Sequence, residues 1–366
     1  MLTASPREHG GVTSPPERLQ RTIRFESEDA RDRAFVSWAQ PDGPVEILAE
    51  PTADGIVLWA ESSGDPVAAV AAIDAVGGRL ADVERFDARS TLLPDDPDVE
   101  GRAAEMFAAR ALGSDRIADL RLAVRAIDLT TLEGDDTAGR VRWLCSRAIR
   151  PDPLDPETEP TAAVCVHPAF VGLARHLTAE TPVKVASVAG AFPSGHSRLD
   201  VRLADIAAAR EAGAHEIDIV LNRAAFLIGN HQLAADEIRA SAEAAGDCHL
   251  KVILEVGDLG SDAAIRSATR LAIEAGADFV KTSTGKTPRN ATPAAVLAMA
   301  EVIAGHADRT GHMVGLKVAG GVRTPDEALG YLALVRATLG DEWLQPERFR
   351  FGASGLLGNL VVALRD

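Results

Sequence analysis

The chain has 366 residues, of which 46% are hydrophobic, and its formal net charge is −16. This length can bury a large core and indicates one large domain together with a smaller one. A net negative charge repels nucleic acid, so we expect no nucleic-acid partner, and any bound phosphate should be small and held by a local cluster of donors.

The sequence also argues against a membrane-spanning segment, a secretion signal and a metal site. No apolar run reaches the ~18 residues needed to span a bilayer, and the first residues lack the charged-then-apolar pattern of a signal peptide. The three cysteines lack Cys-x-x-Cys spacing, and the nine histidines lack His-x-His or His-Glu-x-x-His spacing. We therefore expect a cytoplasmic protein with reduced thiols and no metal site.

Residues 1–19 are rich in Pro, Gly, Ser and charge, which predicts disorder. Residues 20–87 predict a small ferredoxin-like α+β module of order βαββαβ. Its expected strands are Gln20–Glu26, Val45–Glu50, Ile56–Glu61 and Leu80–Phe86, and its helices are Glu28–Ala39 and Asp65–Val76. The module carries no catalytic constellation, so a packing or solubility role is favoured over the binding of a ligand or partner.

An acidic linker, Asp87–Gly101, and a helix near Arg102–Leu112 occupy most of residues 88–125, and the helix should pack on the domain that follows. From residue 126 to 366, strands alternate with alanine-rich helices such as Asp200–Ala212 and Ala263–Ala275. The eight expected strands are Ala126–Thr130, Ala162–Val166, Val183–Val188, Glu216–Leu221, Leu250–Glu255, Phe279–Thr282, Val314–Val318 and Arg348–Phe351. Eight such units predict a (β/α)8 TIM barrel.

Two lysines lie in apolar strands that run into glycines: Lys281 in Phe-Val-Lys-Thr-Ser-Thr-Gly and Lys317 in Gly-Leu-Lys-Val-Ala-Gly-Gly. Catalytic groups of TIM barrels lie near the carboxyl ends of strands. Burial and a neighbouring cation lower the pKa of a lysine, and the neutral amine can attack a carbonyl. Each lysine alone could equally be a solvated strand-end residue or a phosphate contact, but the pair favours imine catalysis.

Asp218 stands alone in an apolar strand, Ile-Asp-Ile-Val. A buried carboxylate is costly without a partner, and the obvious partners are the ammonium groups of Lys317 and Lys281. The arrangement could be a satisfied buried ion pair or a proton relay beside an imine. Because two lysines are expected in the same pocket, we favour the relay.

Candidate phosphate contacts follow the last strands, where TIM barrels commonly bind phosphate. Glycine lets the backbone approach an anion, and the amino end of the expected helix Leu356–Leu364 favours negative charge. The candidates there are Gly320, Gly321, Arg323, Gly352 and Ser354. Gly285-Lys-Thr suggests a nucleotide-binding loop, but Val280 stands where that loop needs a glycine.

From about residue 127 onward the chain resembles the deoxyribose-phosphate aldolase family of class I, imine-forming aldolases. The similarity covers roughly two thirds of the chain, with the motifs in the family's order. The matching segments are Ile127-Asp-Leu-Thr-Thr-Leu132, Ala163-Val-Cys-Val-His-Pro168, Glu216-Ile-Asp-Ile-Val-Leu-Asn222, the two lysine segments and Phe351-Gly-Ala-Ser354.

The resemblance implies a role for each matching residue. Lys281 would form the imine, Lys317 would lower its pKa, and Asp218 would relay protons, an ordering that spacing alone leaves open. Lys286 and Gly285 would help to hold the substrate phosphate. Asp128, Thr130, Cys165 and Thr284 would line the pocket; Cys165 could also be a core thiol, and Asp128 could hydrogen-bond the following turn.

The activity implied is reversible retro-aldol cleavage of 2-deoxy-D-ribose 5-phosphate to acetaldehyde and D-glyceraldehyde 3-phosphate, with no cofactor. Two alternatives stay open: another imine-forming barrel aldolase with a different sugar phosphate, and a non-catalytic sugar-phosphate sensor. The expected partner is a small phosphorylated sugar, and assembly into a homo-oligomer stays open.

Overall fold

The computed structural model describes residues 18–23, 46–52, 55–61, 96–109 and 115–365. The chain divides into two compact units, one formed by residues 1–91 with Leu227–Asn230 and the other by the remainder.

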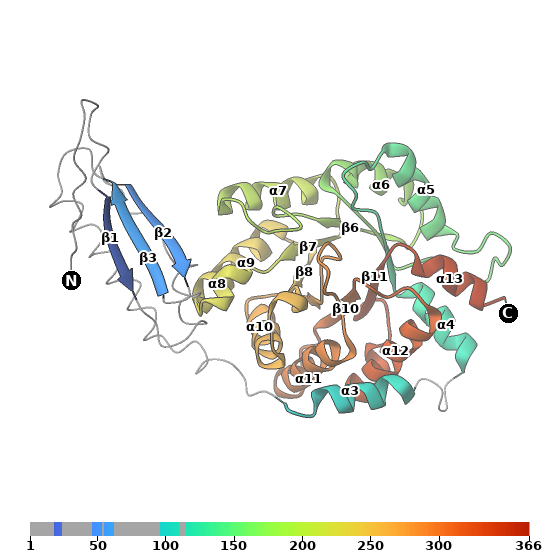
Figure 1. The fold of residues 1–366 in the computed structure, drawn as a ribbon. Helices are drawn as coiled ribbons and strands as arrows, with labels where there is room; N and C mark the ends of the chain where they lie inside the picture. The colour runs from blue at the N-terminus through green and yellow to red at the C-terminus, as the bar shows by residue number, and fades with distance from the viewer. Residues whose placement is uncertain (1–17, 24–45, 53–54, 62–95, 110–114, 366) are drawn as a thin grey trace, which may run out of the picture. The chain divides into compact units, whose positions relative to one another are not determined.

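The first unit contains a three-stranded antiparallel sheet in the order β1-β3-β2, formed by Arg18–Ile23, Gly55–Glu61 and Glu46–Thr52 (Figure 1). β1 begins at Arg18, so the last two residues of the segment predicted to be disordered belong to a strand. The two helices and the fourth strand of the predicted ferredoxin-like module lie outside the described residues. The ferredoxin-like assignment therefore stays a prediction.

The second unit is built on a closed barrel of eight parallel strands, which confirms the predicted (β/α)8 barrel. Around the barrel the order is β10-β11-β4-β5-β6-β7-β8-β9, so each strand pairs with its neighbours in sequence and the last pairs with the first. The strands are β4 (Ile127–Thr130), β5 (Ala163–Val166), β6 (Lys184–Val188), β7 (Glu216–Val220), β8 (His249–Ile253), β9 (Phe279–Lys281), β10 (Gly315–Ala319) and β11 (Phe349–Ala353).

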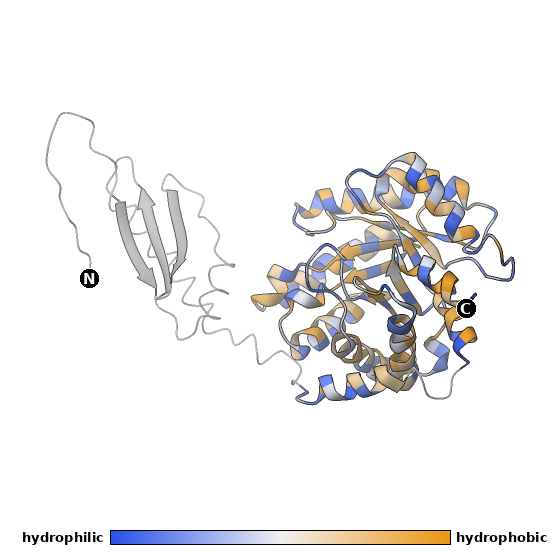
Figure 2. Ribbon diagram, turned by 45° about the vertical axis from the view of Figure 1, so that its right-hand side comes forward, coloured by the Kyte–Doolittle hydropathy of each residue, from blue (hydrophilic) through white to orange (hydrophobic). Residues whose placement is uncertain are grey.

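Helices surround the barrel and turn their apolar faces toward it, as the colouring of Figure 2 shows. Several begin at well-formed caps: Thr324 and Glu327 form a capping box at the start of one helix, and Thr292 caps another. The helices are α3 (Val99–Ala108), α4 (Arg116–Arg125), α5 (Ala138–Ile149), α6 (Val171–Leu177), α7 (Leu199–Glu211), α8 (Arg223–Leu227), α9 (His231–Ala245), α10 (Asp262–Glu274), α11 (Pro293–Thr310), α12 (Pro325–Leu339) and α13 (Leu356–Ala363).

The helix predicted before the barrel packs on it as expected, but it starts earlier. α3 begins at Val99, so the end of the predicted linker is helical. It contacts α11 and α12, and the ring of Phe107 lies 5.0 Å from that of Tyr331 in an edge-to-face contact. The sequence missed this start because charged and small residues dominate the first turn of α3.

Candidate active site

Seven charged side chains are buried inside the barrel, although charged residues are rarely fully buried unless they are paired. Successive side chains of a strand point to opposite faces, so every second residue of these strands can face the interior. The seven are Asp128 on β4, Glu216 and Asp218 on β7, Lys251 on β8, Lys281 on β9, Lys317 on β10 and Arg350 on β11.

The two predicted lysines meet at one carboxylate. Asp218 Oδ2 accepts a hydrogen bond of 2.8 Å from Lys281 Nζ and another of 2.8 Å from Lys317 Nζ. Lys281 and Lys317 are direct neighbours in the register of β9 and β10. Lys281 is the last residue of its strand, whereas Asp218 and Lys317 lie mid-strand, deeper than a strand-end position.

The two lysines differ in their electrostatic surroundings. Burial lowers the pKa of Lys281, and the positive charge of Lys317 lowers it further, against the opposing effect of Asp218. Burial also disfavours the charged form of Lys317, but Asp128 and Asp218 outweigh it and raise the pKa of that lysine. Lys281 is therefore the amine that becomes neutral most easily, while Lys317 stays protonated.

Asp128 takes part in this cluster directly. Its carboxylate accepts from Lys317 Nζ at 2.5 Å and from Arg350 Nη1 at 2.5 Å, and the residue is fully buried. The expectation that Asp128 hydrogen-bonds the following turn with its side chain is wrong: Thr130 Oγ1 donates to the backbone carbonyl of Asp128, and Asp136 accepts from Thr131 Oγ1. The Asp128 carboxylate pairs with Lys317 and Arg350 instead, because these cations are buried beside it.

A second layer of charge lies beneath the lysines, and the sequence reasoning missed it. Lys251 hydrogen-bonds Glu216 and lies 3.3 Å from Asp218 Oδ1. Arg350 Nη2 donates to Glu216 Oε1 at 2.7 Å. A signal was available, because Lys251 interrupts an apolar strand as Asp218 does, and it is one of only five lysines in the chain.

The charges of this interior balance when Lys281 is neutral. Asp128, Glu216 and Asp218 have pKa values below their usual ranges, because the surrounding cations outweigh the desolvation that burial imposes on them. Three carboxylates face the cations Lys251, Lys317 and Arg350. With Lys281 neutral the seven groups carry no net charge, whereas protonated Lys281 leaves an excess positive charge in a medium that penalises it.

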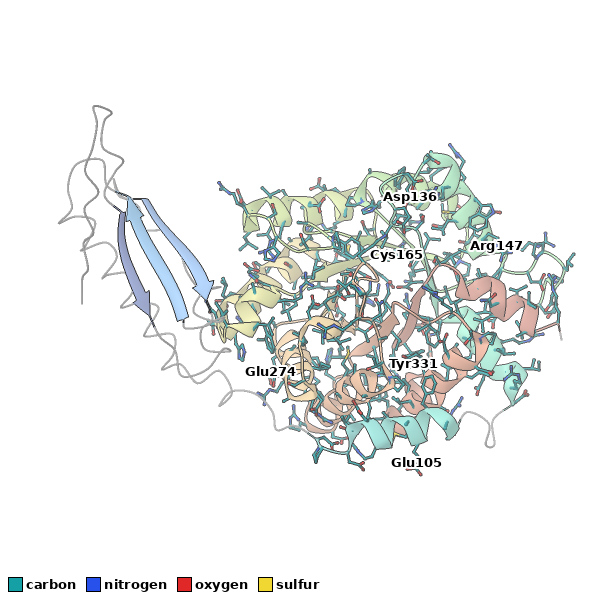
Figure 3. All side chains as sticks on the ribbon, in the orientation of Figure 1. Glu105, Asp136, Arg147, Cys165, Glu274 and Tyr331 are labelled. Atoms are coloured by element: carbon teal, nitrogen blue, oxygen red, sulfur yellow. The ribbon has the colours of Figure 1, made fainter. Side chains whose placement is uncertain are left out.

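An apolar wall completes the upper part of the barrel. Cys165 is fully buried and packs with Leu132, Ala186 and Val188, against which Phe192 also lies. Burial raises the pKa of the Cys165 thiol. Figure 3 labels Cys165 within the barrel unit, in contrast to Glu105 on the outside of α3. Cys165 therefore acts as a small apolar group in this wall, which keeps water from the lysines.

The predicted phosphate contacts lie in adjacent loops after β9, β10 and β11. Gly285, Gly320 and Gly321 have positive φ angles of 77°, 80° and 88°, and a Cβ at Gly285 would lie 3.9 Å from Gly320 Cα. Lys286 is partly exposed and pairs with Glu133 at 2.8 Å. Thr284 is buried beside this loop.

The loop after β10 is tied to the last helix. The carbonyl of Arg323 accepts from Asn359 Nδ2 of α13 at 2.8 Å, and Ser354 lies exposed just before that helix. Gly352 is still within β11, one residue before its end, so the expectation that it follows the strand is wrong. A Cβ at Gly352 would lie 3.1 Å from Lys317 Cε, so glycine leaves room for that lysine.

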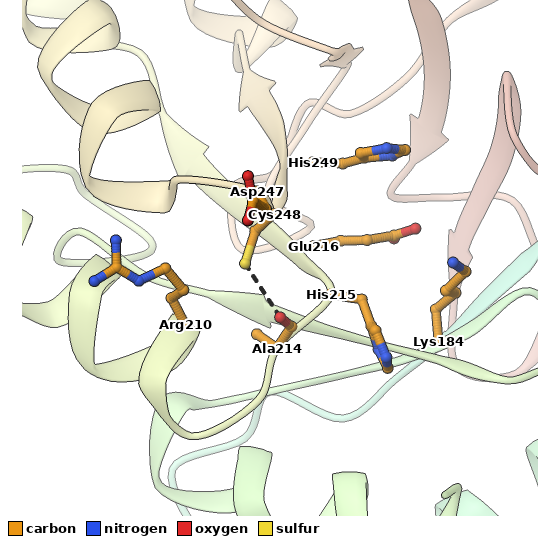
Figure 4. Close-up of a pocket in the computed structure, with 8 residues that line it drawn as sticks. All are labelled: Lys184, Arg210, Ala214, His215, Glu216, Asp247, Cys248 and His249. Carbon is orange, nitrogen blue, oxygen red and sulfur yellow. Dashed lines mark hydrogen bonds between the residues drawn. The ribbon is translucent and has the colours of Figure 1, made fainter. Parts of the chain in front are cut away.

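A cavity of about 400 Å³ opens at the other end of the barrel (Figure 4). Lys184, Glu216 and His249 are the first residues of β6, β7 and β8, so this cavity lies at the amino ends of those strands. It is lined by Lys184, Arg210, Ala214, His215, Glu216, Asp247, Cys248 and His249. Neither predicted lysine lines it, so this cavity is not the predicted imine site.

Residues 122–341 match the model of the DeoC/LacD family of aldolases. The chain is 43% identical over 275 residues to deoxyribose-phosphate aldolase of Homo sapiens, covering 72% of this chain and 86% of the human protein. It is 44% identical over 270 residues to the Mus musculus enzyme of that name, covering 71% and 85%. The family-model match spans the three lysines buried in the barrel.

Solved structures agree with these matches. The tetrameric deoxyribose-phosphate aldolase from Aeropyrum pernix superposes with a TM-score of 0.53 at 26% identity, covering 75% of this chain and 99% of that one. The closed barrel and the family match define the class of this protein as a barrel aldolase. The chain belongs to the DeoC/LacD aldolase family.

No described helix is both long and apolar enough to cross a membrane. In the same part of the chain, no group of three or more His, Cys, Asp or Glu side chains could hold a metal ion.

Proposed function

We propose that the protein catalyses the reversible retro-aldol cleavage of 2-deoxy-D-ribose 5-phosphate to acetaldehyde and D-glyceraldehyde 3-phosphate through an imine on Lys281. The observation that carries this proposal is the buried pair of lysines on Asp218, in which the pKa of Lys281 is lowered and that of Lys317 is raised. The family match and the curated relatives named as deoxyribose-phosphate aldolases support the substrate.

The reaction begins when neutral Lys281 Nζ attacks the C1 aldehyde of the open-chain sugar. The resulting carbinolamine loses water and forms a protonated imine, which withdraws electrons from the C2–C3 bond. Removal of the C3 hydroxyl proton breaks this bond, releases glyceraldehyde 3-phosphate and leaves an enamine. Protonation of the enamine at C2 and hydrolysis of the imine release acetaldehyde and restore Lys281.

Asp218 and Lys317 are suited to move protons in these steps. Asp218 Oδ2 contacts both lysines, while its Oδ1 is buried and accepts no hydrogen bond within the described part of the chain. Asp218 Oδ1 also lies 3.3 Å from Lys251 Nζ. The ionised carboxylate can accept a proton through a water, and the protonated Lys317 can return one. Asp128 holds Lys317 from the other side, and Arg350 in turn holds Asp128.

The substrate phosphate would lie on the loops after β9, β10 and β11. Gly285, Gly320 and Gly321 let backbone amides approach it, and Lys286 and Arg323 add positive charge. Gly352 and Ser354 would place the substrate phosphate at the amino end of α13. The competing pairing of Lys286 with exposed Glu133 is weak enough for a phosphate to replace it.

The proposal is tested by trapping the imine with acetaldehyde and borohydride, followed by mass mapping. The chain has only five lysines, Lys184, Lys251, Lys281, Lys286 and Lys317, so the modified residue is identified directly. An ethyl group is expected on Lys281, and Lys281→Arg should abolish both trapping and turnover, because guanidinium stays protonated. Lys184→Arg is the control and should retain both.

An ethyl group on Lys317 instead would show that Lys317 forms the imine and that Lys281 lowers its pKa. Full turnover of fructose phosphates with none of deoxyribose 5-phosphate would favour the alternative aldolase.

Two wider features belong to the same proposal. A cytoplasmic location is supported by the three cysteines, which are all free and buried. Assembly into a homo-oligomer is supported by the Aeropyrum pernix relative, whose structure is described as tetrameric. Light scattering of the purified full chain tests the second point, and a monomer at micromolar concentration would count against it.

A further inference from the structure

Glu255 is a fully buried carboxylate that the mechanism above does not use. It follows β8, and its backbone, with φ 54° and ψ 61°, lies in the left-handed region that residues other than glycine seldom adopt. Such strain persists only where the surrounding structure enforces it, and it is concentrated at functional sites. The contacts of this carboxylate therefore indicate what the strain serves.

Its contacts close around the loop after β9. Oε2 accepts from Thr284 Oγ1 at 2.5 Å, Oε1 accepts from the Thr284 amide at 3.3 Å, and Oε1 also accepts from Thr287 Oγ1 at 3.2 Å. Thr284 Oγ1 in turn accepts from the amide of Lys286 at 3.1 Å. One carboxylate thus holds both ends of the four-residue segment that contains Gly285 and Lys286.

The same carboxylate is anchored to the neighbouring loops. Arg223 Nη1 lies 3.9 Å from Glu255 Oε2 and 2.5 Å from Asp258 Oδ2, and Arg223 Nη2 donates to the carbonyl of Ser194 at 3.2 Å. The amide of Val256 donates to the carbonyl of Thr282 at 2.9 Å. Glu255 therefore links the loop after β9 to the loops after β6, β7 and β8.

We propose that Glu255 is a positioning residue that presets the Thr284–Thr287 loop for the phosphate group of the substrate. This inference rests on the proposed function, because it assigns the loop to phosphate binding. A loop held in its binding geometry loses less freedom when the phosphate arrives. Removal of the carboxylate should therefore weaken binding of a phosphorylated substrate, while Lys281, which is held by β9 and Asp218, keeps its chemistry.

The test uses Glu255→Gln and Glu255→Asn in the full chain, assayed with 2-deoxyribose 5-phosphate and with unphosphorylated 2-deoxyribose. Asparagine tolerates the left-handed backbone but its shorter side chain does not reach Thr287, which separates the role of the carboxylate from that of the strain. We expect KM for the phosphorylated sugar to rise on the order of tenfold, with kcat and the kinetics of the unphosphorylated sugar nearly unchanged.

Asp119→Asn is the matched control, because Asp119 of α4 is a buried carboxylate that pairs with Arg336 of α12 on the outer helices, away from this loop. It should leave the ratio between the two sugars unchanged. Equal losses on both sugars in the Glu255 variants, or no loss on either, would overturn the proposal. If the Glu255 variants do not fold, Thr287→Val replaces them in the test. It removes one hydrogen-bond donor to Glu255, and KM for the phosphorylated sugar should rise by a smaller factor.

Hydrogen exchange separates this proposal from the proposed function. The amides of residues 284–287 should exchange faster in Glu255→Gln than in the parent protein, whether or not the protein turns over deoxyribose phosphate. Unchanged protection in that segment would overturn the positioning role by itself. A parent protein that shows loop protection but no turnover would count only against the proposed substrate.

Discussion

At the scale of single residues, the lysine content of the chain is informative. Lysine accounts for only five of the 38 basic residues, and three of the five lie buried in the barrel. Arginine can provide surface charge, but it cannot lose its proton to become a nucleophile. Lys251, Lys281 and Lys317 are these buried amines, and among them only Lys281 has a lowered pKa.

Lys317→Leu should raise the pKa of Lys281, because it removes a positive charge that lowers this pKa. Lys281 reacts only when neutral, so activity falls as the pH drops through its pKa, and a higher pKa moves this acidic limb to higher pH. We expect a shift of about one pH unit or more in the profile of kcat/KM, with a lower maximum. Circular dichroism should show an intact fold.

An acidic limb that stays in place with full activity would contradict the like-charge explanation. Lys286→Leu provides the comparison, because Lys286 is partly exposed and pairs with Glu133 rather than with Asp218. It should change KM for the phosphorylated sugar without moving the limb.

At the scale of secondary-structure elements, close helix packing places strict limits on side-chain size. Gly330 lies inside α12, and a Cβ there would be 2.6 Å from the ring of Phe107 on α3. Gly305 lies inside α11, and a Cβ there would meet only the flexible end of Arg309, at 3.5 Å. Both glycines lie inside helices, but there is no room for a methyl group at Gly330, whereas there is room at Gly305.

Gly330→Ala should destabilise the protein by about 1–3 kcal/mol, because the added methyl group forces α3 away from α12. Gly305→Ala should instead stabilise it by up to ~1 kcal/mol, because alanine is the better helix former and the site is open. Urea unfolding of both variants measures the difference. Equal changes in the two midpoints would show that α3 does not pack tightly.

At the scale of the whole molecule, the catalytic face is assembled within one unit of the chain. Every candidate site residue lies between Asp128 and Ser354, and the family model covers residues 122–341. The described segment before the barrel is bound to it from Asp96 onward: the amide of Asp96 donates to Asp262 at 2.8 Å, and Arg102 pairs with Glu301 at 2.6 Å.

A chain that begins at residue 90 should therefore stay soluble and retain most of its turnover, because it keeps the whole site and α3. A chain that begins at residue 115 is the comparison. It lacks α3, whose Ala103 is fully buried, and it should expose apolar surface on α11 and α12 and lose stability. Size-exclusion chromatography and kcat measure both outcomes, and aggregation of the longer chain would assign residues 1–89 a structural role.

The sequence by itself determined the barrel and its key amines. Short apolar runs between helical stretches predicted all eight barrel strands to within about two residues at each end, because buried parallel strands carry a strong hydrophobic signal. Lys281, Lys317 and Asp218 stood out because a charge inside such a run requires a partner. Spacing along the chain could not order the two lysines, since their difference arises from the carboxylates that surround each one.

Only the tertiary structure decided those surroundings. Closing the barrel pairs β4 with β11, which is itself paired with β10, so Asp128 and Arg350, which are 222 residues apart, meet near Lys317. Glu216 and Lys251 complete the charge balance from strands that the sequence showed separately. Glu255, which follows β8, likewise contacts the loop that follows β9. Burial, charge and pKa depend on distances in space, and these become defined only when the barrel closes.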